Sequence, residues 1–217
     1  MIKSDNISDN KKHTTDPIYK SDNRNATAPS DARLENRKLR LAILGAGGIA
    51  RKMAETVNRM EEVELYAVAS RTEEKARQFA DTYHASKWYG SYEEMVADDG
   101  IDLVYVATPH SHHKEHTMLC LNHNRAVLCE KAFAVNTKEA EDMIRLAKEK
   151  NTAIILSLHE LDLAQKLSDA VVCVSPNSVS DIMTVKDAFQ KENIQKLYKM
   201  SAEEYTFPVS YTHLTLP

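Results

Sequence analysis

The residues whose types and spacing most directly imply chemistry form a glycine-rich run that matches the pattern G-x-G-x-x-G/A: Gly45-Ala46-Gly47-Gly48-Ile49-Ala50. The run follows a short apolar segment and opens a helical pattern. In that context the N–H groups of the helix start face a diphosphate. Gly45 permits a tight turn, Gly47 lets the backbone approach the pyrophosphate, and Ala50 permits close helix–strand packing. The run therefore predicts a dinucleotide site.

The choice between NAD and NADP depends on the end of the second expected strand. An acidic residue that would hold a ribose 2′-hydroxyl is missing there, because Ala69-Ser70-Arg71 takes its place and no acid occurs before Glu73. Ser70 and Arg71 could instead hold a 2′-phosphate, since a guanidinium suits phosphate geometry. We therefore expect NADP to be preferred over NAD. The alternative is that Arg71 is a solvated arginine at a helix start.

Alternating strand and helix patterns must position these residues. Short apolar runs predict strands at residues 39–44, 63–69, 87–89, 101–106, 126–129 and 153–158. Helical patterns predict helices from Ile49 to Met60, over 73–83, after Ser91, over 111–122, and from a cap at Thr137 to Lys150. Strands that alternate with helices predict an α/β fold, namely a Rossmann-type doubly wound parallel sheet over residues 38–151.

The segments on either side differ in character. Residues 1–37 are polar and mixed in charge, so we expect a disordered tail. Residues 152–209 predict an atypical C-terminal α/β extension. Its expected parts are a helix at 161–167, a strand at 171–174, a loop over 175–185, and helices near 186–190 and 193–200. The apolar run at 153–158 could take the place of the sheet's sixth strand.

Several short motifs resemble those of the Gfo/Idh/MocA oxidoreductases: Ala67-Val68-Ala69-Ser70-Arg71, Val106-Ala107-Thr108-Pro109-His110 with His113, and Cys129-Glu130-Lys131. Within that family, GGIARKMAET and LCEKAFAVN are most similar to the dihydrodiol dehydrogenase-like branch. The likeness covers about residues 39–151, the family's cofactor domain. It implies an NAD(P)-dependent oxidoreductase that transfers a hydride between nicotinamide and a sugar- or diol-like alcohol.

The resemblance also implies roles for individual residues. Glu130 and Lys131 match the first two residues of the family's E-K-P motif, which makes them the expected catalytic pair, with the lysine near the reacting hydroxyl. A partly desolvated lysine has a lowered pKa, which suits proton transfer from an alcohol. Together, the glycine run and the resemblance give these expected cofactor contacts: Gly45, Ala46, Gly47, Gly48, Ile49, Ser70, Arg71, Thr108, Pro109, His110, His113, Glu130 and Lys131.

One residue departs from the family's pattern. Ala132 stands where the motif has proline, which often forms a cis bond in this turn. A cis bond before a residue other than proline costs roughly 2.5–4 kcal/mol. We therefore expect the loop after Lys131 to relax.

A competing pattern lies in the same stretch, because His112-His113-Lys114-Glu115-His116 fits the zinc-peptidase pattern H-x-x-E-H. On a helix, His112 and His116 would share one face. A zinc enzyme also needs a third ligand, and the sequence downstream offers no convincing one. We therefore expect no metal.

The last third of the chain resembles a different family. The run Ile155–Lys166, which includes His159, is similar to the switch-histidine region of ABC transporter ATPases of the iron-uptake type, and Val171–Val174 and Ile194–Tyr198 continue the likeness. The phosphate-binding loop G-x-x-x-x-G-K-[ST] is missing from the sequence, so we assign His159 no catalytic role. The likeness predicts a chimera joined near 146–151, and residues 210–217 resemble a translated adapter sequence.

Complete members of the oxidoreductase family continue into an antiparallel-sheet domain that carries the substrate pocket and often pairs subunits. We expect this chain to lack that domain, and oligomerisation stays open. Two alternatives to an active oxidoreductase also stay open: a catalytically incomplete dinucleotide-binding fragment, and an ABC-type ATP-binding subunit.

Composition narrows the remaining possibilities. The net charge of −4 gives no basic excess for nucleic acid. The sequence has neither an apolar run of about eighteen residues, which a membrane span needs, nor a signal-peptide core at its start. Cys120, Cys129 and Cys173 lie in apolar runs without paired spacing, which predicts buried free thiols in a reducing cytoplasm.

Overall fold

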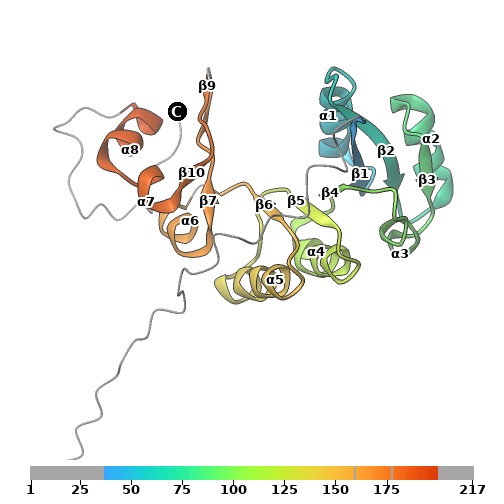
Figure 1. Cartoon of the computed structure of the whole chain (residues 1–217). Coiled ribbons are helices and arrows are strands. Elements are labelled where there is room, and N and C mark those ends of the chain that lie inside the picture. The colour runs from blue at the N-terminus through green and yellow to red at the C-terminus, as the bar shows by residue number, and fades with distance from the viewer. Residues whose placement is uncertain (1–36, 159, 177, 200–217) are drawn as a thin grey trace, which may run out of the picture. The chain divides into compact units, whose positions relative to one another are not determined.

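The computed structural model describes residues 37–158, 160–176 and 178–199. The tail expected over 1–37 lies, except for Arg37, outside the described residues, as do His159 and the segment 210–217. The fold is built on a six-stranded sheet with the order β3-β2-β1-β4-β5-β6 (Figure 1). Every neighbouring pair of strands in it is parallel.

The strands have these bounds: β1 Leu39–Leu44, β2 Val63–Ala69, β3 Lys87–Tyr89, β4 Leu103–Val106, β5 Ala126–Cys129 and β6 Ile154–Leu156. The expected α/β class and the parallel sheet are therefore confirmed. Strand order reverses between β1 and β4, and such a switch point is where open parallel sheets bind ligands, outside the carboxyl ends of the strands.

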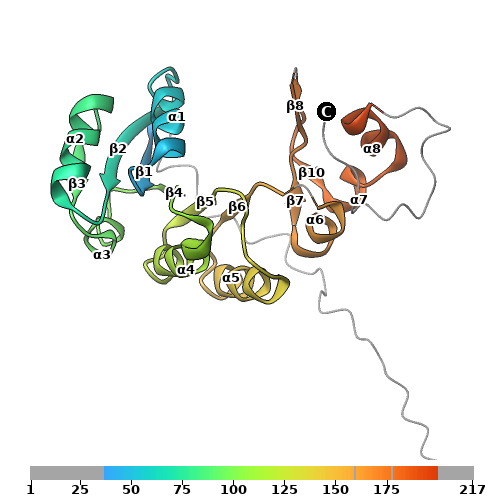
Figure 2. The same cartoon turned by 180° about the vertical axis from the view of Figure 1, so that it is seen from behind.

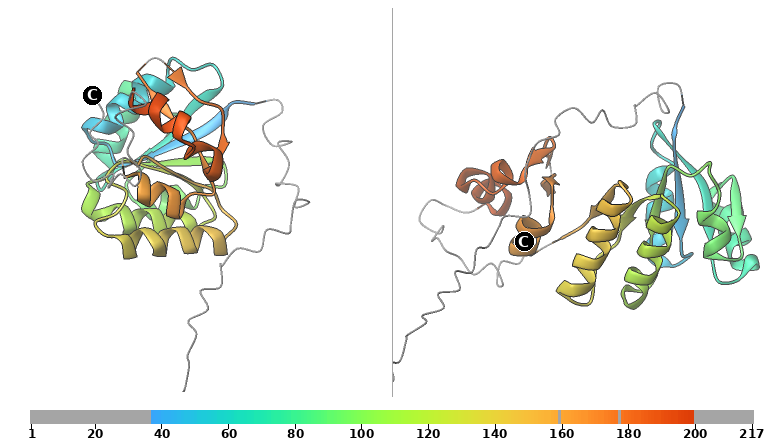
Figure 3. Two further views of the ribbon diagram at one scale, coloured as in Figure 1. Left: turned by 90° about the vertical axis from the view of Figure 1, so that its left-hand side faces the viewer. Right: turned by 60° about the horizontal axis from the view of Figure 1, so that its bottom comes forward.

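The helices between these strands have these bounds: α1 Gly48–Val57, α2 Glu73–Tyr83, α3 Tyr92–Val96, α4 His113–Asn122 and α5 Thr137–Glu149, with a short 3₁₀ turn, η2 His110–His112, before α4. Two buried clusters show how they cover the sheet. Residues of α1 and α2 form one cluster with Leu41 and Ile43, whereas α3, α4 and α5 form the other with Ala42 and Leu44. Successive residues of β1 thus face opposite layers. The helices α4 and α5 lie next to each other on one face (Figures 2 and 3).

Three boundaries differ from the sequence expectations. Helix α1 stops at Val57, and Met60 lies in a tight turn, 44% exposed, rather than on the buried helix face. Strand β4 begins at Leu103, because Ile101 belongs to a turn in which its N–H donates to Asp98. The N-cap of α5 is Asn136, not Thr137, since the Asn136 side chain accepts a hydrogen bond from the Glu139 N–H.

Beyond β6, the described residues form small elements: α6 Leu161–Leu167, β7 Ala170–Val171, β8 Val174–Ser175, β9 Ser178–Val179, β10 Met183–Thr184, α7 Val185–Ala188 and α8 Lys191–Tyr198. Strand β6 pairs with β5, so the apolar run does supply the sixth strand. The expected single strand at 171–174 and loop at 175–185 are wrong. The chain instead doubles back, so that β8 pairs with β9 and β7 with β10, both antiparallel.

Candidate functional site

The loop between β1 and α1 requires glycine at its first position. Gly45 has a φ of +104°, and an added Cβ would lie 2.9 Å from Thr108 Cγ2 and 3.2 Å from the Ala107 carbonyl oxygen. Gly47 is the N-cap of α1, and Ala50 is fully buried against the sheet. Ile49 is 40% exposed on the first turn of α1. Backbone groups at this helix start can therefore approach a ligand, as a dinucleotide cradle requires.

The end of β2 presents Ser70 and Arg71. Ser70 is buried and its N–H donates to the Tyr89 carbonyl oxygen, which fixes the chain there. Arg71 is exposed in the loop before α2. Burial raises the pKa of Tyr92, and the nearby charge of Arg71 opposes that rise, so the guanidinium lies close to the start of α3. A free guanidinium at this edge of the sheet suits a phosphate.

The loop after β4 is held by histidines. Thr108 is buried, and its hydroxyl shares a hydrogen bond of 2.9 Å with His116 Nδ1. Pro109 and His110 are exposed. Burial lowers the pKa of the His116 imidazole. This loop lies beside the glycine turn, since Thr108 Cγ2 is the nearest obstacle to a side chain at Gly45.

His113 lies beneath that loop rather than on its surface. The imidazole is 1% exposed, with Nε2 at 2.8 Å from the Thr108 carbonyl oxygen and Nδ1 at 2.7 Å from the Ala132 carbonyl oxygen. The ring therefore joins the loop after β4 to the loop after β5. The Lys131–Ala132 peptide bond is cis.

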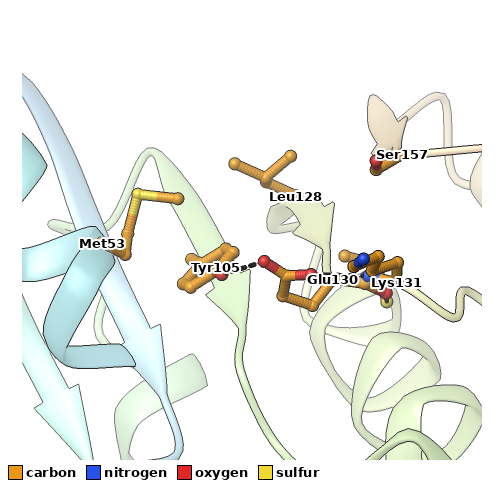
Figure 4. Close-up of a pocket in the computed structure, with 7 residues that line it drawn as sticks. Met53, Tyr105, Leu128, Glu130, Lys131 and Ser157 are labelled. Atoms are coloured by element: carbon orange, nitrogen blue, oxygen red, sulfur yellow. Dashed lines mark hydrogen bonds between the residues drawn. The ribbon is translucent and has the colours of Figure 1, made fainter. Parts of the chain in front are cut away.

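Glu130 and Lys131 follow β5 and line a pocket of about 260 Å³. Its other lining residues are Met53, Tyr105, Leu128, Cys129 and Ser157. The Tyr105 hydroxyl donates to Glu130 Oε1 at 2.6 Å, and the Lys131 N–H donates to Glu130 Oε2 at 2.8 Å (Figure 4). The Lys131 side chain is exposed at the pocket.

The sequence motifs missed Tyr105. The contact depends on the strand register, in which Tyr105 pairs with Leu128, and residues two apart share a face. Glu130 therefore lies on the same face as Tyr105. The motifs also missed Ser157, which follows β6.

His112, the last residue of η2, and His116 of α4 lie side by side, with ring centroids 5.6 Å apart, so the two histidines share a face as expected. Within the described residues, no group of three or more His, Cys, Asp or Glu side chains is placed to hold a metal ion. The described residues also contain no helix with the length and apolar character of a membrane span.

The cysteines are free. Cys120 and Cys129 are buried, and burial raises the pKa of their thiols to about 12 and about 11. Because a thiol reacts as the thiolate, these two are chemically quiet. Cys173 is only partly buried, contrary to expectation.

Comparisons with known proteins agree with this geometry. The profile of the Gfo/Idh/MocA oxidoreductase family, NAD-binding Rossmann fold, matches residues 39–159, more than half of the chain. The site and fold thus define the NAD-binding domain of an oxidoreductase. The chain belongs to the Gfo/Idh/MocA family.

Individual relatives point the same way. A scyllo-inositol 2-dehydrogenase (NADP(+)) of Bacillus subtilis (strain 168) is 44% identical over 110 residues, which are 51% of this chain and 34% of the relative. A trans-1,2-dihydrobenzene-1,2-diol dehydrogenase of Mus musculus is 38% identical over 112 residues, again 51% of this chain and 34% of the relative. The chain thus spans about a third of the length of these relatives.

Among solved structures, GenD2 from gentamicin A biosynthesis in complex with NAD is similar, with a TM-score of 0.53 and 25% identity. The match covers 60% of this chain and 39% of GenD2. The match to the mouse trans-1,2-dihydrobenzene-1,2-diol dehydrogenase confirms the expected likeness to dihydrodiol dehydrogenases. Residues beyond 159 lie outside the family match.

Proposed function

We propose that this chain binds NADP(H) in preference to NAD(H), as the cofactor part of an oxidoreductase acting on a sugar-, polyol- or diol-like alcohol. One observation carries the proposal: the glycine cradle, Arg71 and Lys131 follow β1, β2 and β5, so they lie at the carboxyl edge of one parallel sheet. The residues fit such a cofactor, because Gly48 and Ile49 are exposed at the start of α1, where backbone N–H groups can approach a phosphate. The names of the relatives support the substrate class.

Each expected contact then has a role. The pyrophosphate is held by Gly45, Ala46, Gly47, Gly48 and Ile49, the 2′-phosphate by Ser70 and Arg71, and the rest of the cofactor by Thr108, Pro109, His110, Glu130 and Lys131. His113 acts from below, by holding the loops that carry Thr108 and Lys131.

When bound, the nicotinamide accepts or supplies the hydride. The chain's own catalytic group is the Lys131 amine, which orients the alcohol and exchanges its proton. The Glu130 carboxylate accepts a hydrogen bond from the backbone N–H of Lys131, which fixes the main chain that carries this amine.

The test of cofactor preference is a fluorescence titration with NADPH and NADH. For Arg71→Ala we expect the Kd for NADPH to rise about tenfold or more, since charge-assisted hydrogen bonds contribute about 1.5–3 kcal/mol, and the Kd for NADH to change less than twofold. Arg145→Ala is the control, because Arg145 pairs with Asp142 and Glu149 on α5. Equal weakening of both cofactors by Arg71→Ala would contradict the assignment.

The alternative is a chain that binds the cofactor without turning over substrate. A panel of sugars, polyols and diols separates the two, because any cofactor-linked oxidation above that of a Lys131→Ala control rejects an inert fragment.

We also propose a separate origin for residues 152–209, as an ABC-ATPase-like fragment joined to the dinucleotide domain of residues 38–151. It is supported by the short antiparallel strands after α6, which form no part of the six-stranded sheet. Reading single long DNA molecules across codons 140–160 tests this, and one natural molecule that spans the join rejects it.

The unpaired cysteines support a reducing compartment, so we place the protein in the cytoplasm.

A further inference from the structure

We propose that Tyr105 is a positioning residue for Lys131 and acts through the carboxylate of Glu130. The inference rests on the proposed function for the role of the Lys131 amine, whereas the contacts that carry it belong to the chain itself. Tyr105, Glu130 and Lys131 line one pocket, and Tyr105 lies between Met53 and Glu130 in it (Figure 4).

The sheet brings Tyr105 and Glu130 together. Tyr105 of β4 pairs in parallel register with Leu128 of β5, and Glu130 comes two residues later on the same face. The Glu130 N–H also donates to the Val106 carbonyl oxygen at 3.3 Å, which continues the ladder past the end of β5. This backbone hydrogen bond therefore fixes the main chain at Glu130, from which the carboxylate side chain extends.

The Glu130 carboxylate is held at both oxygens. Oε1 accepts from the Tyr105 hydroxyl at 2.6 Å, and Oε2 accepts from the Lys131 N–H at 2.8 Å. A hydrogen bond to a carboxylate is shorter and stronger than one between neutral groups. Glu130 therefore connects the two residues. The Tyr105 hydroxyl holds one carboxylate oxygen, and the other oxygen holds the backbone N–H of Lys131.

Tyr105 is suited to be a permanent donor. Its side chain is 2% exposed, and burial, followed by the hydrogen bond to Glu130, raises the pKa of Tyr105 above its ordinary range. The phenol therefore stays protonated at every pH at which the protein would work. It can hold the carboxylate but does not compete with Lys131 for a proton.

Lys131 needs such support. Its side chain is exposed, and a four-carbon stem with a free end samples many rotamers. A fixed backbone at Lys131, with a carboxylate beside it, limits the positions that the amine reaches. Removing the Tyr105 hydroxyl should therefore change the environment of the Lys131 amine, although within the described residues that hydroxyl bonds to Glu130 and not to the amine.

The test compares two tyrosines that make the same bond in different places. Tyr105→Phe removes the hydroxyl bonded to Glu130, and Tyr89→Phe removes a hydroxyl that donates to Asp98 at 2.6 Å, away from the pocket. The full chain, without nucleotide, is reductively methylated with carbon-13 formaldehyde, and Lys131→Arg assigns the Lys131 amine signal by NMR. We expect the chemical shift of the Lys131 amine signal to change in Tyr105→Phe and to stay as in wild type in Tyr89→Phe.

An unchanged Lys131 signal in folded Tyr105→Phe overturns the proposal, and so does an equal change in Tyr89→Phe. If circular dichroism shows that Tyr105→Phe does not fold, Glu130→Gln is the deciding variant, because the connection through Glu130 needs the carboxylate. A Lys131 signal unchanged in Glu130→Gln likewise overturns the proposal.

The result is independent of cofactor binding, which the NADPH titration of the wild-type chain tests separately. For a chain that turns over, we expect Tyr105→Phe to lower kcat about tenfold with less than a twofold change in the KM for NADPH. A rise in KM with kcat unchanged would assign Tyr105 to cofactor binding and reject the positioning role.

Discussion

At the scale of single residues, the glycine turn between β1 and α1 depends on the absence of a Cβ at Gly45. Its φ of +104° lies in the region that residues with a Cβ rarely adopt, and the space beside it is already filled by Thr108 and Ala107. Thr108 is in turn held by His113 and His116. A side chain at Gly45 would therefore push on the loop that carries three of the proposed cofactor contacts, Thr108, Pro109 and His110.

Gly45→Ala tests this packing. We expect the variant to lose about 1–3 kcal/mol in the free energy of unfolding, because it combines backbone strain with a contact of 2.9 Å, and to bind NADPH at least tenfold more weakly. Chemical denaturation and the fluorescence titration measure the two effects. Gly48→Ala is the stability control, since an added Cβ at Gly48 meets nothing within 4 Å. Equal losses in the free energy of unfolding for Gly45→Ala and Gly48→Ala would contradict this explanation.

Residue types and spacing predicted the glycine run, Arg71 and Lys131, because each belongs to a local motif. They did not predict that Tyr105 binds Glu130 or that His113 is buried between two carbonyl groups. The Tyr105–Glu130 and His113–Ala132 contacts join residues 25 and 19 positions apart, and only strand pairing and helix docking bring these residues together.

At the scale of elements, Asp98 ties together the edge of the sheet. After α3, its carboxylate accepts hydrogen bonds from Lys87 and Tyr89 of β3, each at 2.6 Å, and from the Gly100 N–H at 2.9 Å. Burial acts against ionisation, but these donors outweigh it and lower the pKa of Asp98 well below its ordinary range.

Asp98→Asn should therefore destabilise the protein in a pH-dependent way. A carboxylate with a depressed pKa stabilises the fold above its unfolded pKa, and that contribution disappears as the pH falls through the folded pKa. We expect a loss of about 2 kcal/mol at pH 7, shrinking below about pH 4. Urea unfolding at several pH values measures it.

Asp99→Asn is the matched control for that series. Asp99 pairs with Arg125 but its side chain is 99% exposed, so its removal should have little effect on stability. A constant difference between wild type and Asp98→Asn from pH 7 to pH 3 would contradict the role of the charge.

The ends of elements were the hardest to predict. Asn136 and Thr137 are both good cap residues, but Glu139 stands three residues after Asn136, which is the capping-box spacing and favours Asn136. The small strands after α6 were also misjudged, because two-residue ladders carry almost no periodicity.

At the scale of the whole molecule, cofactor binding and folding are linked. A ligand that binds only the folded chain adds about 2.7 kcal/mol of stability at one hundred times its Kd. For a domain of this size we expect NADPH to raise the Tm by about 5–10 °C. Differential scanning fluorimetry measures the shift. Gly45→Ala, which we expect to bind at least tenfold more weakly, should gain at most about 1.4 kcal/mol and about half of that rise at the same concentration. An equal rise in that variant would place NADPH elsewhere on the molecule.

The sequence alone determined the class of fold, the sheet's strands and the dinucleotide motif, because these follow from short-range periodicity and from glycines at fixed spacing. The tertiary structure decided how the site is held. The Tyr105–Glu130 hydrogen bond and the burial of His113 arise where β4, β5 and α4 pack together. Such contacts depend on the register and docking of elements that are distant in sequence, and no local pattern encodes them.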